Sequence, residues 1–118
     1  MATVRDVVMI GAGPSALAAA IYTTREDIDT VLYEKGVVGG MAAITDKVDN
    51  YPGFAEGIEG MKLAEQLQAQ AERFGAVIEL GDVTEIRDNG KTKTVVVDGE
   101  EVETKTVLIA TGSDYNKI

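Results

Sequence analysis

The chain contains no cysteine and no histidine. Without cysteine it has no disulfide framework, no thiolate metal site and no redox dithiol, and without histidine we exclude zinc chemistry and imidazole-based acid–base catalysis. Basic residues are also scarce. The chain has 11 Lys and Arg but 20 Asp and Glu, which gives a net charge of −9. Long-range repulsion at this charge argues against nucleic acid or an anionic membrane as a partner.

Long uninterrupted apolar runs are missing as well. The most apolar stretch, 7–22, follows Arg5 and Asp6 and is broken by Gly11, Gly13 and Pro14, whereas a membrane span needs about 20 apolar residues. We therefore expect neither a leader nor a span, and a soluble, cytoplasmic protein. Hydrophobic residues make up 45% of the 118 residues, enough for one core, so we expect a single domain over residues 1–118.

The N-terminal third has the pattern of a βαβ unit. The β-branched run Asp6–Ile10 predicts a buried strand, and Pro14 suits the first position of a helix that reaches Arg25. A second strand follows at Thr30–Tyr33 and ends at Glu34. A strand, a tight turn, a helix and a strand within about 30 residues indicate one right-handed crossover.

The remaining chain predicts further strands and one helix. An irregular, glycine-rich stretch spans 35–60, and loops of this length are usually functional. Apolar spacing predicts a helix at 61–74 and a strand at 76–80, and the turn pairs Asn89-Gly90 and Asp98-Gly99 predict an antiparallel meander from Val83 onward. A separate last strand is expected at 106–110. We expect Tyr22, Tyr33 and Phe74 in the core. The predicted strands and helices follow one another in the order of an α/β fold.

A nucleotide-binding pattern lies at the turn between the first strand and the helix. Gly11 permits the tight turn, Gly13 lets a phosphate approach the backbone, and Ala16 keeps the helix close to the sheet. Free N–H groups of the first helical turn, with a possible hydroxyl from Ser15, then face a pyrophosphate. Glu34 stands 21 residues after Gly13, where a carboxylate can accept both ribose hydroxyls. A turn that serves packing alone is the alternative, and NAD(P) fits this pattern as well as FAD.

Four stretches together resemble the bacterial thioredoxin reductases and related low-molecular-weight flavoproteins. They are DVVMIGAGPSALAAAIYTTR, YEKGVVGGMAA, DKVDNYPGF and TVLIATGS, and the resemblance is collinear over essentially the whole chain. It implies a Rossmann-like three-layer α/β domain with a parallel sheet, helices and a β-meander. It also implies that the dinucleotide is FAD, with NAD(P) the less favoured cofactor.

The resemblance also implies roles for individual positions. Glu34 and Lys35 match the adenosine-ribose corner, and Val83 matches a backbone contact to adenine. The residues that match the flavin side are Gly39, Gly40, Met41 and Asn50. Those that match the segment where the chain leaves the domain are Ala110, Thr111 and Gly112. Three of them have simpler alternatives: Met41 stands where the family usually has Gln and can be inert, Asn50 can cap a turn, and Gly112 can serve chain reversal.

Two parts of the family pattern are absent from the sequence. The NADPH-binding domain that carries the dithiol does not occur, nor does the C-terminal segment that returns to the flavin. We therefore expect an excised, engineered or reconstructed domain with one sheet flank uncovered, and a homodimer that covers this flank with a second copy. Three functions stay open: an FAD-binding module without catalytic residues of its own, a minimal flavin-dependent NAD(P)H oxidoreductase, and an empty scaffold.

Overall fold

The structure is a computed structural model and describes residues 4–40, 48 and 50–111. The elements within these residues are β1 (Arg5–Ile10), α1 (Pro14–Arg25), β2 (Thr30–Glu34), α3 (Gly60–Arg73), β3 (Val77–Leu80), β4 (Val83–Asp88), β5 (Lys93–Val97) and β6 (Glu100–Ile109). The strands and helices expected from the sequence are present with small shifts at their ends, apart from the last strand.

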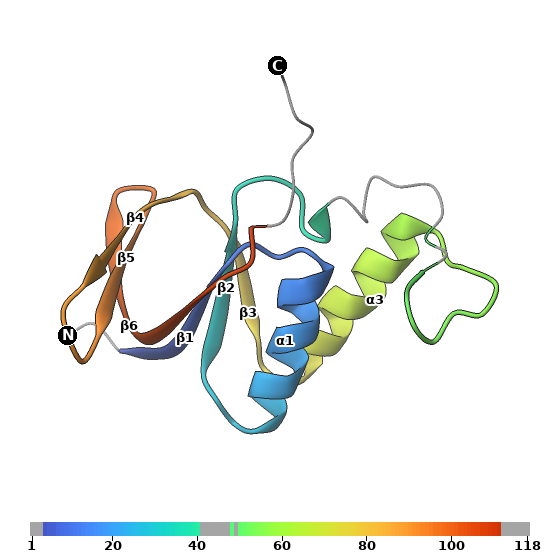
Figure 1. The fold of residues 1–118 in the computed structure, drawn as a ribbon, viewed down its shortest axis with the longest axis horizontal. Helices are drawn as coiled ribbons and strands as arrows, with labels where there is room; N and C mark the ends of the chain where they lie inside the picture. Colours follow the sequence, from blue (N-terminus) through green and yellow to red (C-terminus); the bar gives the residue numbers. More distant parts are fainter. Residues whose placement is uncertain (1–3, 41–47, 49, 112–118) are drawn as a thin grey trace, which may run out of the picture.

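One mixed sheet contains all of these strands, in the order β3-β2-β1-β6-β5-β4. β1 pairs in parallel with β2 and with β6, and β2 pairs in parallel with β3. β4, β5 and the first half of β6 form the antiparallel meander. Figure 1 shows the meander at one end of the molecule and the two helices at the other. The predicted βαβ unit and the predicted meander are both confirmed.

The last strand differs from the prediction. We expected the third meander strand and residues 106–110 to be separate, but β6 runs unbroken from Glu100 to Ile109. Its first half pairs with β5, and from Thr104 onward it pairs with β1. This segment contains no glycine or proline that would interrupt it, and its Val and Thr residues favour extended backbone. β6 therefore leads from the meander directly to the carboxyl edge of the parallel strands.

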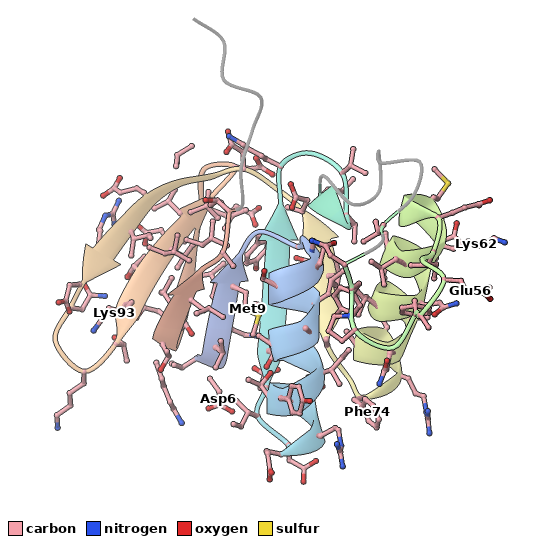
Figure 2. All side chains as sticks on the ribbon, turned by 45° about the vertical axis from the view of Figure 1, so that its right-hand side comes forward. Asp6, Met9, Glu56, Lys62, Phe74 and Lys93 are labelled. Carbon is pink, nitrogen blue, oxygen red and sulfur yellow. The ribbon has the colours of Figure 1, made fainter. Side chains whose placement is uncertain are left out.

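The two helices cover one face of the parallel strands. Met9 of β1 and Leu32 of β2 are fully buried there against Leu17 of α1 and Leu63 of α3. Figure 2 labels Met9 on the strand next to α1. Burying each of these side chains contributes about 1.5–3 kcal/mol. This apolar layer fixes where α1 begins relative to the end of β1.

The meander supplies the apolar layer on the opposite face. Successive side chains of a strand point to opposite faces, so Val8 and Val31 point away from the helices. Both are buried in a cluster with Val95 and Val97 of β5. The helices, the parallel strands and the meander are the three layers that the sequence predicted.

The prediction that Tyr22 lies in the core is wrong. Its side chain is 70% exposed, whereas the preceding residue, Ile21, is buried. One residue corresponds to about 100° of rotation around a helix, which turns Tyr22 away from the face of α1 that packs on the sheet. Tyr33 and Phe74 are half-buried. No helix in the described part of the chain has the length and apolar character needed to cross a membrane.

Candidate functional site

The turn between β1 and α1 needs glycine at its first position. Gly11 has a φ of +109°, a backbone conformation that other residues rarely adopt. A Cβ here would also overlap the carbonyl oxygen of Ala110 and come within 2.9 Å of its carbonyl carbon. The Gly11 N–H donates to the Tyr33 carbonyl at 2.7 Å, and the Ala110 N–H donates to the Ile10 carbonyl at 2.9 Å. The predicted role of Gly11 in a tight turn is consistent with this geometry.

Gly13 has neither of these structural requirements. Its φ of −79° and ψ of −175° are open to any residue. A Cβ built on Gly13 would meet no atom within 4 Å. Neither conformation nor packing therefore explains a glycine here, and its missing side chain leaves space at the start of α1.

Backbone N–H groups face this space without acceptors. Among the described residues, no acceptor is found for the N–H groups of Gly13, Ser15 and Ala16, and the helical bonds begin with Leu17, which donates to the Gly13 carbonyl at 2.9 Å. The first turn of α1 contains no acidic residue. Unpaired N–H groups and the positive end of the helix dipole together favour an anion at this place.

Glu34 at the end of β2 links the two sides of the turn. Its Oε1 accepts a hydrogen bond from the Ala12 N–H at 2.8 Å, and its Oε2 accepts one from the Gly36 N–H at 2.9 Å. A carboxylate has about four acceptor positions, so each oxygen keeps capacity for a ligand hydroxyl. Glu34 thus orders the turn directly, in addition to the ribose contact that the sequence suggested.

Replacing Glu34 by glutamine should destabilise the chain even without a ligand. A glutamine amide has one oxygen, so it can satisfy either the Ala12 or the Gly36 N–H but not both. Leaving one N–H without its partner costs about 1–3 kcal/mol of unfolding free energy, measurable by urea denaturation. Glu79→Gln, on exposed β3, is the matched control and should change stability by less than about 0.5 kcal/mol. Equal stabilities of the two variants would contradict this role of Glu34.

A hollow of about 90 Å³ lies at the carboxyl ends of β1 and β2, and we call it the edge hollow. Its lining residues are Ile10, Gly11, Tyr33, Glu34, Lys35, Gly81, Asp82, Val83 and Thr111. The fold therefore brings five predicted site residues together here, namely Gly11, Glu34, Lys35, Val83 and Thr111. In open α/β sheets this carboxyl edge is where ligands bind.

Sequence reasoning missed Gly81 and Asp82 in the wall of the edge hollow. A Cβ on Gly81 would lie 2.6 Å from a methyl carbon of Val97, and the Gly81 N–H donates to the Glu34 carbonyl at 2.9 Å. The Asp82 N–H donates to the Asp98 carboxylate at 3.1 Å, and the Asp98 N–H donates back to the Asp82 carbonyl at 3.1 Å. These bonds dock the Asp98 turn against the wall. The only signal of these two residues in the sequence is a glycine two positions before Val83.

Tyr33 also lines the edge hollow, although it was expected in the core. Burial raises the pKa of its phenol, and the nearby Glu79 carboxylate raises it further. The phenol is therefore neutral at physiological pH and can act as a hydrogen-bond donor there.

The glycine pair after β2 lies against the first turn. The Gly39 N–H donates to the Ala12 carbonyl at 2.6 Å. A Cβ on Gly40 would lie 3.2 Å from the Gly13 Cα and 3.8 Å from Pro14. Both glycines therefore stand beside the start of α1, where Ser15 is exposed and Ala16 is buried.

Asn50, another predicted site residue, does not line the edge hollow. Asn50 is exposed and lines a shallow surface depression formed by residues 50–55. Met41 and Gly112 lie outside the described residues.

Comparisons with known proteins agree with this geometry. A family profile described as "Pyridine nucleotide-disulphide oxidoreductase" matches residues 5–118. The thioredoxin reductase of Bacillus subtilis is 42% identical over 113 residues, which cover 96% of this chain and 35% of that protein. That of Listeria monocytogenes is 41% identical over the same length, with the same coverage.

Solved structures show the same fold. The thioredoxin reductase of Lactococcus lactis superposes with a TM-score of 0.90 at 39% identity, over 97% of this chain and 37% of that one. The one from Streptococcus pyogenes superposes with a TM-score of 0.92 at 33% identity, over 100% of this chain and 38% of that one. These superpositions confirm the Rossmann-like three-layer fold. The chain spans a little over a third of the length of the relatives it matches.

Proposed function

Because the chain belongs to the pyridine nucleotide-disulphide oxidoreductase family, we propose that it is the FAD-binding part of a thioredoxin reductase-type flavin oxidoreductase. Its fold is that of the FAD-binding domain of thioredoxin reductases, and FAD is the cofactor of that domain. The observation that carries the proposal is the open start of α1, where Gly13 leaves space that no packing demand explains.

In this proposal the residues of the turn hold the ADP part of FAD. The N–H groups of Gly13, Ser15 and Ala16 donate to the pyrophosphate, and Glu34 accepts from the ribose hydroxyls. Lys35, Val83 and Thr111 surround the adenosine in the edge hollow, where a NAD(P) adenosine would also fit. Residues assigned to the flavin side and to the end of the domain are Gly39, Gly40, Met41, Asn50, Ala110 and Gly112.

The chain's own contribution is binding and orientation. FAD supplies the redox chemistry when it is bound, and we assign no catalytic acid, base or nucleophile to this chain. For a longer protein that contains this domain, we propose electron transfer from NADPH to a disulfide, by analogy with the relatives' names. We propose that residues 1–118 form one domain.

We also propose a cytoplasmic location for the chain. The apolar N-terminal stretch forms β1 and α1 of the core. Val8, Met9 and Leu17 of this stretch are fully buried.

The absorption spectrum of the purified protein tests FAD binding. We expect flavin absorbance at one FAD per chain after desalting, and a melting temperature that rises with added FAD, since a ligand at 100 times its Kd adds about 2.7 kcal/mol of stability. A colourless protein that also shows no heat of binding with added FAD would contradict FAD binding and support the empty scaffold. NADPH oxidation with an artificial acceptor would instead support the minimal oxidoreductase.

A further inference from the structure

A groove of about 330 Å³ lies between α1 and α3, which Figure 1 shows side by side, and we call it the helix groove. Each helix contributes one stripe of lining residues with the spacing i, i+3, i+4, i+7, which begins at Ala18 on α1 and at Leu63 on α3. Tyr51, Pro52 and Phe54 line the groove from the loop before α3. The helix groove and the edge hollow share no described lining residue, so they are separate sites.

The lining of the helix groove is apolar at its base and aromatic above it. Ile21 of α1 and Leu67 of α3 are buried lining residues, whereas Tyr22 is 70% exposed. Tyr51 and Phe54 are half-buried, with ring centroids 6.4 Å apart and planes tilted by 45°. Aromatic rings at such separations and tilts attract a further ring edge to face or offset. The lining therefore favours a flat aromatic body, and the volume lies at the lower end of small-molecule sites.

The charge of the helix groove favours an anionic group on the ligand. Arg25 is the one charged residue among the lining residues that the structure describes, although the net charge of the chain is −9. Its Cζ lies 6.0 Å from the ring centroid of Phe74, which Figure 2 labels below the last turn of α3, and this cation–π contact stabilises the position of the guanidinium. A guanidinium binds a carboxylate through two parallel N–H···O bonds. Gln66 and Gln70, one turn apart on α3, add amide donors.

We propose that the helix groove binds a small planar aromatic carboxylate. The ring of this ligand packs against Tyr22, Tyr51 and Phe54, and its carboxylate binds Arg25. A neutral aromatic molecule lacks the contact with the guanidinium, and a carboxylate on a saturated ring lacks the aromatic contacts, so both bind more weakly. The site is independent of FAD, because FAD is assigned to the turn at the start of α1 and to the edge hollow.

A titration with 2-naphthoate, followed by the amide signals of the protein in heteronuclear NMR, tests the site. We expect a dissociation constant on the order of 0.1–1 mM and signal shifts along the facing stripes of α1 and α3, with or without FAD. The uncharged 2-naphthamide and the saturated cyclohexanecarboxylate should each bind at least about fivefold more weakly. An absence of binding up to about 10 mM would overturn the proposal. Displacement of naphthoate by FAD, or shifts confined to the edge hollow, would place the ligand in the FAD site and overturn it as well.

Arg25→Gln tests the carboxylate contact. It should weaken naphthoate binding about tenfold and leave naphthamide binding unchanged, because only naphthoate has a charge for the guanidinium to bind. Arg73→Gln is the matched control. Arg73 lies in the last turn of α3 with its Cζ 5.2 Å from the same Phe74 ring, but it does not line the helix groove. Equal losses in the two variants would assign the effect to overall charge and contradict the site.

Tyr22→Ala tests the aromatic contact. It should weaken the binding of naphthoate and of naphthamide alike, by about threefold or more. Met61→Ala is the control, since Met61 is 61% exposed on α3 and does not line the helix groove. Both residues are exposed, so both variants should fold as the wild type does. Unchanged naphthoate binding in Tyr22→Ala would show that the ring does not pack here.

Discussion

Replacing Gly13 by aspartate should abolish FAD binding without unfolding the chain. Gly13 is the N-cap of α1, a position that aspartate favours because its carboxylate accepts from the free N–H groups of the first turn. The same carboxylate would fill the open space and repel a pyrophosphate. We expect a loss of FAD affinity of at least about 100-fold, or about 2.7 kcal/mol, and an unchanged or slightly higher melting temperature of the protein without FAD. Calorimetric titration and thermal unfolding measure the two effects.

Ala69→Asp is the control for the Gly13 variant. Ala69 is exposed on α3, so the substitution makes the same change in net charge away from the turn. It should bind FAD as the wild type does. Equal loss of affinity in both variants would assign the effect to overall charge, and normal binding by Gly13→Asp would show that the phosphates do not bind at this turn.

The parts of the fold that are local in the sequence could be predicted. β1, the turn and α1 follow each other without a gap, so the residues between Asp6 and Arg25 contain nearly all the information on their arrangement. Glu34 was located in the same way, because the spacing fixes the end of β2 relative to the turn. The meander was predictable because Asn89-Gly90 and Asp98-Gly99 have turn chemistry that few other structures use.

The parts that depend on distant contacts could not be predicted. The hydrogen bond from the Ala12 N–H to Glu34 joins residues 22 positions apart, and no local pattern indicates it. Gly81 and Asp82 take their place in the wall of the edge hollow through contacts with Val97 and Asp98, at the end of β5. Tyr22 was misplaced because an alanine-rich helix leaves the direction of its buried face poorly defined by the sequence.

Replacing Gly11 by alanine should destabilise the chain strongly, in contrast to changes at Gly13. The new Cβ would be held at a φ of +109° and pressed against the carbonyl group of Ala110. Relief requires β1 and the end of β6 to move apart, and these are neighbouring strands of the core. We expect the free energy of unfolding to fall by about 3 kcal/mol or more, and the melting temperature by about 10 °C or more.

Gly90→Ala separates backbone strain from the contact with Ala110. Gly90 has a comparable φ of +92°, but a Cβ there would meet nothing within 4 Å. This variant carries only the cost of the backbone conformation, about 1–2 kcal/mol, so the difference between the two alanine variants measures how tightly the end of β6 packs on the turn. Equal unfolding free energies of Gly11→Ala and Gly90→Ala in urea would mean that Ala110 moves away from the new Cβ at little cost in free energy. In that case the turn would not be fixed by β6, and the open start of α1 would depend for its order on Glu34 and on the backbone hydrogen bonds to Tyr33 and Gly39.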